Sequence, residues 1–381
     1  MKLEFDVIKV RTKLRLPIGD RGLSVDTCDF AVISVLDDQS GKKGWGYGIC
    51  MTEGYFKNAG WWIQPMMAEA DIRRELREKL SNLWEGKGVE SLMSFGDHLP
   101  LELTWMRRGA EMALRDLEAK IHDKTVYQML GGKDPSPRVK AYGSLLDFPL
   151  SDEQAFEKLD YFLQNGFDRI KVKIGAPSLD RDIARLKLIR DRAGEKVHIT
   201  ADGNQAWNLE ETVRAMRGIE KAGIFLDYIE DPMPLSLTQE YPELRKRSPF
   251  KVAAHDYIQR FEELEVLMKS GGVDFVRSSS SVPIHQQLSP LAVELGIGII
   301  YGNSNMESSM HSAAALPGTA FMEYSHLDYN CLLKDPIQVQ EGCLIVPEGK
   351  GFGLDPNEAL LKEVHYPQVS EFKNQPCPWK E

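Results

Sequence analysis

Short apolar runs alternate with amphipathic stretches through the middle of the chain, and this alternation constrains the fold more than any other feature. There are eight such runs, at residues 139–145, 169–174, 197–201, 225–229, 251–254, 275–276, 297–301 and 320–323. The stretches between them, such as residues 179–192 and 209–222, carry apolar residues at helical spacing. Eight strand–helix units in succession predict the α/β class and a (β/α)8 barrel of the TIM type. A doubly wound sheet is disfavoured, because no Gly-x-Gly-x-x-Gly turn follows the first strand.

The regions on either side of this alternation have a different pattern. The N-terminal part contains two predicted strands and two predicted helices, at residues 2–15, 30–37, 68–84 and 105–130. Gly131 and Gly132 then mark the end of a helix. We therefore predict an α+β capping domain at residues 1–135, the barrel at residues 138–330, and a C-terminal segment at residues 331–381 that packs back on the cap.

Composition narrows the class of protein. The chain has 381 residues, of which 42% are hydrophobic and 27% are charged, as expected for a globular protein with a large core. The net charge of -10 argues against nucleic acid as a partner, although a bound cation still allows an anionic small molecule. No apolar run approaches the length of a membrane span, and the N-terminus lacks the apolar core of a signal peptide. The five cysteines are scattered, which favours reduced thiols and a cytoplasmic protein.

Acidic residues stand at the ends of three consecutive predicted strands. Asp202, Glu230 and Asp256 follow the third, fourth and fifth runs. Active sites of such barrels lie at the C-terminal ends of the strands, and neighbouring strands are about 4.8 Å apart. Three carboxylates that converge there would repel one another unless a cation neutralised them. Oxygen ligands of this kind suit Mg²⁺, with water and substrate completing the octahedron.

Other interpretations of these acids remain. Taken singly, each acid is more often a solvated loop residue or a helix N-cap, and only the repetition at three strand ends favours a metal site. Asp231 lies beside Glu230 and is an alternative ligand. His255 lies beside Asp256, and imidazole also binds metals, so the third ligand is either of these two.

Two lysines lie in the second predicted strand, toward its end. Lys171 and Lys173 are two residues apart, so both side chains point to the same face and into the mouth of the barrel. Buried lysines are rare unless they are paired or catalytic, and the alternative is a salt bridge to the acids. In a dry pocket near a cation, the pKa of a lysine falls and the amine becomes a base. Together with Mg²⁺, such a base predicts removal of the proton next to a substrate carboxylate, with the enediolate stabilised by the metal.

Several sequence segments together resemble a known family. They are residues 114–132 (LRDLEAKIHDKTVYQMLGG), 170–175 (IKVKIG), 201–207 (ADGNQAW), 229–232 (IEDP) and 303–308 (NSNMES). The chain resembles the enolase superfamily, in the branch of mandelate racemase and muconate lactonizing enzyme. The segments occur in the family's order over nearly the whole chain, and their combination is more specific than any one of them.

The resemblance implies roles for individual residues. It implies Mg²⁺ on Asp202, Glu230 and Asp256, with Lys173 as the general base. It implies that Lys171 and Glu323 hold the substrate carboxylate. Two cap loops, at about residues 17–26 and 51–62, would close over the mouth. The residues expected to contact the substrate are Asn204, Ser279, Asn303, Tyr55, Lys57 and Trp61. Relatives of this type are often homo-oligomers, so the resemblance implies a homo-oligomer and a small-molecule carboxylate substrate.

The departures from the family pattern bear on the reaction. Asn303 stands where mandelate racemase-like members have a histidine, and Ser279 where relatives have an aspartate or a lysine. A racemase needs a second acid/base on the opposite face of the substrate, so these residues favour dehydration of an acid sugar (a uronate, aldonate or aldarate) to a 2-keto-3-deoxy acid. A racemase, epimerase or cycloisomerase is the alternative, and a metal-binding relative without activity is a third. The general acid stays open among Lys173, His326, Tyr324, Arg277 and His255.

Overall fold

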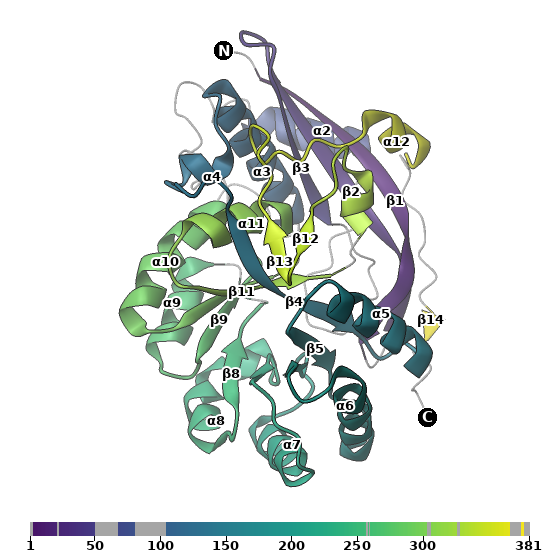
Figure 1. Cartoon of the computed structure of the whole chain (residues 1–381). Helices are drawn as coiled ribbons and strands as arrows, with labels where there is room; N and C mark the ends of the chain where they lie inside the picture. The colour runs from purple at the N-terminus through teal and green to yellow at the C-terminus, as the bar shows by residue number, and fades with distance from the viewer. Residues whose placement is uncertain are drawn as a thin grey trace.

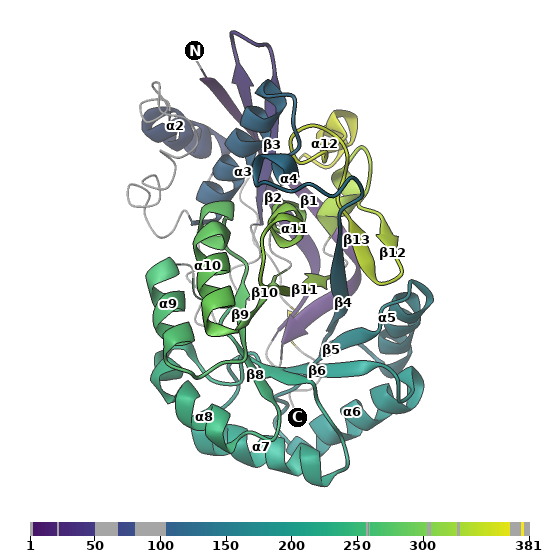
Figure 2. The same cartoon turned by 60° about the vertical axis from the view of Figure 1, so that its left-hand side comes forward.

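The structure is a computed structural model that describes residues 3–20, 23–49, 68–80, 104–256, 258, 260–302, 306–325, 328–365 and 375–376. It has two parts that pack against each other, an antiparallel sheet with helices and a barrel of parallel strands (Figure 1). The C-terminal elements lie beside both parts (Figures 1 and 2). The chain therefore consists of a barrel with a cap, as the sequence predicts.

Eight parallel strands form the barrel, and pairing of the last strand with the first closes it. The strands are β4 (Arg138–Leu146), β5 (Arg169–Lys173), β6 (His198–Asp202), β7 (Tyr228–Glu230), β8 (Lys251–Ala254), β9 (Phe275–Ser278), β10 (Gly298–Tyr301) and β11 (Thr319–Tyr324). The helices that surround them are α5 (Asp152–Gln164), α6 (Leu179–Ala193), α7 (Leu209–Lys221), α8 (Tyr241–Arg247), α9 (Phe261–Lys269), α10 (Val282–Leu295) and α11 (Met306–Ala315) (Figure 2). A 3-10 helix, η4 (Leu235–Glu240), precedes α8. All eight predicted apolar runs overlap these strands, which confirms the predicted fold class.

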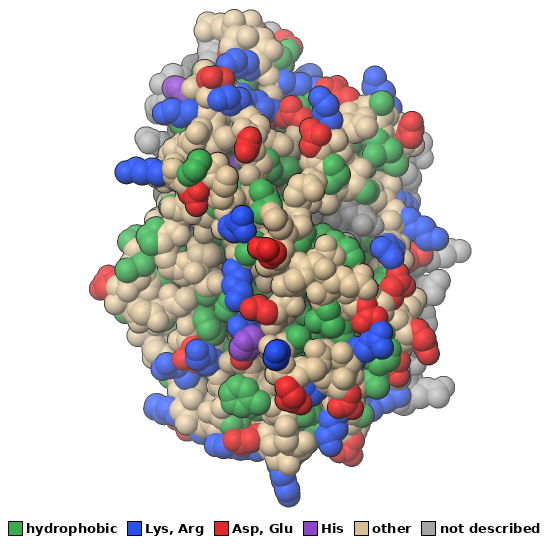
Figure 3. All heavy atoms as spheres, viewed as in Figure 1, with side chains coloured by type: hydrophobic (Ala, Val, Ile, Leu, Met, Phe, Trp, Pro, Cys, Tyr) green, Lys and Arg blue, Asp and Glu red, His purple; other side chains and the backbone are tan. Residues whose placement is uncertain are grey.

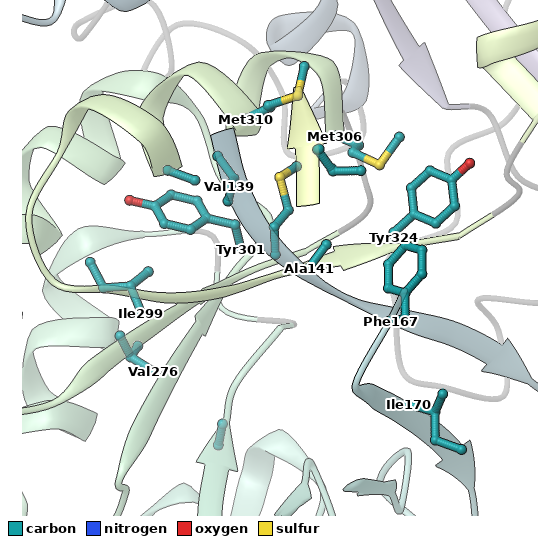
Figure 4. Packing of buried hydrophobic residues seen from close by; sticks show 14 of the residues in the cluster. Val139, Ala141, Phe167, Ile170, Val276, Ile299, Tyr301, Met306, Met310 and Tyr324 are labelled. Carbon is teal, nitrogen blue, oxygen red and sulfur yellow. The ribbon is translucent and has the colours of Figure 1, made fainter. Parts of the chain in front are cut away.

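The outward side chains of the strands form the apolar layer between barrel and helices. On β4 and β10, Val139, Ala141 and Tyr301 are buried in this layer. Met310 of α11 packs onto it from outside (Figure 4). Because side chains alternate along a strand, the residues between these point into the barrel. The inner face can therefore carry polar residues while the outer face supplies the hydrophobic core.

Local sequence signals position several barrel helices. Ser151 begins α5 with a capping box in which its side chain accepts from the Gln154 backbone N–H and the Gln154 side chain accepts from the Ser151 backbone N–H. Asn208 and Glu211 form the same arrangement at the start of α7. Each box satisfies two backbone donors that would otherwise lack partners. These caps fix where each helix starts after its strand and so fix the path of the loops at the barrel mouth.

The cap is a sheet covered by two helices. Its strands are β1 (Leu3–Asp20), β2 (Leu23–Asp37) and β3 (Lys43–Ile49), and its helices are α2 (Glu69–Leu80) and α3 (Thr104–Ile121), followed by the short α4 (Val126–Met129). Helix α3 lies very close to β3 because Gly44 and Gly46 have no side chains. A Cβ atom on Gly46 would lie 2.1 Å from the carbonyl oxygen of Gly109. These glycines are therefore packing residues.

Three details of the cap differ from the predictions. The sequence Lys43–Ile49 is a strand that we did not predict, because its alternating glycines resemble a loop. The helix predicted at residues 105–130 ends at Ile121, and α4 follows after Asp123, whose φ is +55°. The cap loop predicted at residues 17–26 consists largely of the ends of β1 and β2, in which Ile18 pairs with Val25. The register of the two strands shifts between Lys13 and Ile18. The predicted loop at residues 51–62 lies outside the described residues.

The C-terminal segment contacts both the barrel and the cap. It contains η5 (Asp328–Leu332), β12 (Val339–Gln340), β13 (Cys343–Ile345), α12 (Glu358–Glu363) and β14 (Gln375–Pro376). Strand β13 pairs with β4 of the barrel, and β14 pairs with β2 of the cap. The Phe352 N–H donates to Asp116 Oδ1 of α3 at 2.7 Å. The segment therefore joins the two parts, whereas the exact domain boundaries stay a prediction.

The surface gives little guide to partners. Lys and Arg side chains are intermixed with Asp and Glu over the face shown in Figure 3, without a large area of one sign. None of the helices in the described part of the chain is long and apolar enough to cross a membrane. The site must therefore be found from the barrel interior.

Candidate active site

Strand β5 places three basic side chains on the inner face of the barrel. Its sequence, Arg-Ile-Lys-Val-Lys, is buried throughout, and alternation puts Arg169, Lys171 and Lys173 on one face. The strand register sets Lys173 opposite Asp202 of β6, and Asp202 opposite Glu230 of β7. A base and two acids therefore lie side by side at the C-terminal ends of three neighbouring strands, as the sequence predicts.

Lys171 is the centre of a buried ion cluster. Its Nζ atom lies 2.6 Å from Glu230 Oε1, 3.0 Å from Glu323 Oε1 and 3.4 Å from Asp202 Oδ2. Its side chain is only 4% exposed, so these contacts are made in a medium that screens charge poorly. Glu323 comes from β11, on the far side of β4 in the barrel wall. The structure thus joins residues that are 152 positions apart in sequence.

The acids around Lys171 set the pKa of this lysine. Burial and Arg277 oppose the charged form of Lys171, but the carboxylates of Glu230, Glu323 and Asp202 outweigh them and raise its pKa well above the usual value. Lys171 is therefore a fixed cation and no base. Lys173 is buried one step nearer the mouth, at the end of the strand. It stays the predicted general base.

The structure separates the two candidates for the third metal ligand. Asp256 lies toward the cluster: its Oδ1 is 3.5 Å from Arg277 Nε and accepts a hydrogen bond from Ser279 Oγ. The His255 ring is fully buried and packs against the ring of Tyr241, with centroids 5.9 Å apart. Burial lowers the pKa of His255 to about 4. These positions favour Asp256 over His255 as a ligand and leave His255 as a neutral core residue.

Arg277 contacts residues from several barrel strands, which the sequence did not predict. It lies on the inner face of β9, and its side chain is 2% exposed. Its Nη1 donates to the Tyr142 hydroxyl at 2.9 Å, its Nη2 donates to Glu323 Oε2, and its Nε lies 2.9 Å from Glu230 Oε1. The sequence showed an arginine on a barrel strand, but only the closed barrel brings it against acids from β7 and β11.

Glu323 is held as an anion by these contacts. Burial alone would favour its neutral form, but Arg277 and Lys171 hold the pKa of Glu323 well below its usual range. The Ser144 hydroxyl of β4 also donates to Glu323 Oε1. A carboxylate held in this way cannot give up a proton near neutral pH. An ionised Glu323 can accept a hydrogen bond from a substrate hydroxyl, but it has no proton to donate to a substrate carboxylate, so the predicted contact with that carboxylate stays a prediction.

The positions of the carboxylates show how well the site suits a divalent cation. Within the described residues, no three acidic, histidine or cysteine side chains lie close enough together to hold a metal as they stand. Lys171 and Arg277 instead join the acids in pairs. The donor chemistry nevertheless fits, because Glu230 Oε2 is buried without a hydrogen-bond partner. Burial also raises the pKa of Glu230 to about 7, against the effect of Arg277 and Lys171, so a further cation would stabilise its charged form.

Asp147 is a site residue that the sequence analysis missed. It follows β4, the first barrel strand, and is fully buried. Its Oδ2 accepts from the Gly19 backbone N–H of the cap hairpin at 2.9 Å. Burial raises its pKa, although Lys173 opposes the shift. An acid at the end of the first strand was visible in the sequence, and the same strand-end rule could have identified it.

The remaining predicted residues fall into three groups. Asn204 lies at the site, where its backbone N–H donates to Asp202 Oδ1 at 2.9 Å, and Ser279 contacts Asp256. Tyr324 is on the outer face of β11, where its ring stacks on Phe167 (Figure 4), so it is excluded as the general acid. The other predicted site residues lie outside the described residues: Asn303, His326, Tyr55, Lys57 and Trp61.

Comparison with known families identifies this arrangement. Residues 155–360 match the family model described as "Enolase C-terminal domain-like". The chain belongs to the enolase superfamily. This confirms the resemblance to the mandelate racemase and muconate lactonizing enzyme branch.

Curated relatives of the chain have more than one activity. An arabinonate dehydratase from Saccharolobus solfataricus is 28% identical over 313 residues, which cover 79% of this chain and 81% of the relative. A 3,6-anhydro-alpha-L-galactonate cycloisomerase from Streptomyces coelicolor is 25% identical over 362 residues, which cover 91% and 96%. A lyase and an isomerase thus match at similar identity. Identity alone does not select the reaction.

Solved structures share the fold. A candidate mandelate racemase from Mesorhizobium loti superposes with a TM-score of 0.85 at 24% identity, covering 97% of this chain and 96% of that one. An enolase from Bradyrhizobium, solved with magnesium and mandelic acid, gives a TM-score of 0.79 at 23% identity, covering 96% and 99%. The whole chain, cap and barrel together, therefore follows the fold of this superfamily.

Proposed function

We propose that the chain is a Mg²⁺-dependent enzyme that abstracts the proton next to a substrate carboxylate, and that its reaction is the dehydration of an acid sugar to a 2-keto-3-deoxy acid. The observation that carries the proposal is the cluster around Lys171, which gathers Asp202, Glu230 and Glu323 at one end of the barrel. Buried ionised groups are costly to desolvate, and clusters of them at the C-terminal end of a barrel are typical of active sites.

The proposed roles follow from position and charge. Asp202, Glu230 and Asp256 would hold Mg²⁺, which supplies positive charge beside the substrate carboxylate and so makes its α-proton more acidic. Lys171 is a fixed cation that binds the same carboxylate. Lys173, nearer the mouth, takes the proton. Magnesium in the Bradyrhizobium structure supports the choice of cation.

The choice of dehydration rests on what the opposite face of the substrate offers. Ser279 hydrogen-bonds Asp256, and a serine hydroxyl is a poor base. Arg277 is held in its charged form by acids and cannot accept a proton. Elimination can proceed with Lys173 alone, because the same amine can return its proton to the departing hydroxide. The arabinonate dehydratase among the relatives supports this reaction.

An isomerase remains the second candidate. The cycloisomerase relative favours it, since that protein matches 91% of this chain. In that case a group outside the described residues would supply the second acid/base. A homo-oligomer also stays a prediction.

The test is a screen of the purified protein with Mg²⁺ against aldonates, aldarates and uronates, in which semicarbazide detects 2-keto acids. We expect one stereochemical series to react, and EDTA to abolish the reaction until Mg²⁺ is restored. If no acid sugar yields a keto acid but an α-proton exchanges with D₂O, the isomerase replaces the dehydratase. If no α-proton exchanges at all, the proposed chemistry is wrong.

A further inference from the structure

Arg277 contacts several residues in and around the ion cluster. From one guanidinium it reaches Tyr142 of β4, Glu323 of β11, Glu230 of β7 and, at 3.5 Å, Asp256. These residues come from four different parts of the barrel wall. The side chain is 2% exposed, so its charge is balanced only by these neighbours.

The guanidinium of Arg277 lies close to carboxylate oxygens of two proposed metal ligands. Arg277 Nε lies 2.9 Å from Glu230 Oε1 and 3.5 Å from Asp256 Oδ1. Both residues are proposed Mg²⁺ ligands. Glu230 Oε1 is also 2.6 Å from Lys171 Nζ, whereas Glu230 Oε2 has no hydrogen-bond partner. Oε1 of Glu230 therefore contacts Lys171 and Arg277, whereas Oε2 could bind a further cation.

A fixed positive charge beside metal ligands has two opposite effects. It holds the carboxylates in place and stabilises their charged form. It also repels a dication that binds to the same carboxylates, and at a few ångströms in a buried site this repulsion is large. An apolar or neutral residue at this position would do neither.

We propose that Arg277 is a positioning residue that holds Glu230 and Glu323 in place and weakens the affinity of the site for Mg²⁺. The inference rests on the proposed function, because it takes Glu230 and Asp256 as ligands of that ion. Arg277 thereby makes the site dependent on the concentration of free Mg²⁺ and keeps the ion exchangeable.

The experiment compares Mg²⁺ binding to the intact protein and to Arg277→Gln by isothermal titration calorimetry, without substrate. Removing the charge should lower the dissociation constant for Mg²⁺ by about tenfold or more. Arg277→Lys keeps a charge and should stay within about threefold of the wild type. A purely structural role predicts the opposite, since loss of a scaffold residue disorders ligands and weakens binding.

Arg169→Gln is the matched control. Arg169 is also an arginine inside the barrel with little exposure, but it pairs with Asp227 and lies over the Phe321 ring at 4.2 Å. It contacts none of the proposed ligands among the described residues. Its Mg²⁺ affinity should equal that of the wild type. Tighter binding in both variants would indicate a general charge effect and overturn the role of Arg277.

Arg277→Gln leaves Glu323 without its partner, so it risks misfolding. In that case Glu323→Gln is compared with the double variant Glu323→Gln/Arg277→Gln, which buries no unpaired charge at these two positions. The double variant should bind Mg²⁺ about tenfold more tightly than the single one. Unchanged or weaker binding in either comparison overturns the inference and leaves the proposed function standing. Absence of saturable Mg²⁺ binding to the wild type would overturn both.

Discussion

Two groups of side chains inside the barrel differ in chemistry. An apolar cluster is formed by Tyr142, Tyr228, Ala253 and Ile300, with Phe321 packed against them. An ion cluster is formed by Lys171, Lys173, Asp202, Glu230, Arg277 and Glu323. The two clusters touch, because Arg277 Nη1 donates to the Tyr142 hydroxyl at 2.9 Å. Burial of the apolar cluster gains free energy without a charged partner, so this cluster stabilises the barrel, whereas the ion cluster carries the proposed chemistry.

The largest effect should follow a change at Lys173. Lys173→Met should slow α-proton exchange with D₂O by at least about 10³-fold, since a positioned base contributes about 10² to 10⁴. NMR of a substrate in D₂O gives the rate. Exchange at an undiminished rate would show that another group is the base.

A change at Lys171 should lower the stability of the protein. Lys171→Met leaves Glu230, Glu323 and Asp202 without a central cation, so it should lower the unfolding free energy by about 4 kcal/mol. Urea denaturation measures this change. An unfolding free energy equal to that of the wild type would contradict the central place of Lys171 in the ion cluster.

In the apolar cluster, a cavity should act mainly on stability. Ile300 is fully buried, and Ile300→Ala should lower the unfolding free energy by about 3 kcal/mol. Ile300 pairs with Arg277 between β10 and β9. A loss of exchange rate larger than the loss of folded protein would therefore show that the apolar cluster and the ion cluster are coupled.

A smaller effect depends on pH. Asp182 of α6 accepts the backbone N–H groups of Gly175 and Ala176, which follow the strand that carries Lys173. Burial raises the pKa of Asp182 to about 6, although these two donors oppose the shift. A raised pKa means that the folded state favours the protonated acid, so its contribution is present at low pH and is lost as pH rises through 6. Between pH 4 and pH 7 the wild type should lose up to about 3 kcal/mol relative to Asp182→Asn. Denaturation at both pH values checks this, and a constant difference would refute it.

The smallest effect is expected at the surface where β6 begins, at the N-terminal end of the barrel. His198 is half exposed, and its Nδ1 lies 3.0 Å from Asp227 Oδ1. A pair at the surface contributes little, so His198→Ala should change the unfolding free energy by less than about 1 kcal/mol and leave exchange unaffected. A marked loss of exchange would place function at this end too.

Strand and helix order could be predicted because each depends on local patterns. The eight apolar runs overlap the eight barrel strands, since burial on two faces requires apolar residues there. Strand β3 was missed because Gly44 and Gly46 resemble turn residues until α3 is seen packed against them. The fold and the family are confirmed. The roles of Lys173, Asp202, Glu230 and Asp256 stay predictions, although the structure brings these residues together.

Patterns along the chain are enough to predict the barrel, the strand ends that carry acids, and the shared face of Lys171 and Lys173. Each of these depends on the order and spacing of neighbouring residues. The closed barrel was needed to show that Lys171 is a fixed cation, that Tyr324 lies on the outer face, and that Arg277 contacts acids from other strands. The reason is physical: a pKa and an ion pair depend on distances between residues far apart in the chain, and closure of the barrel sets those distances.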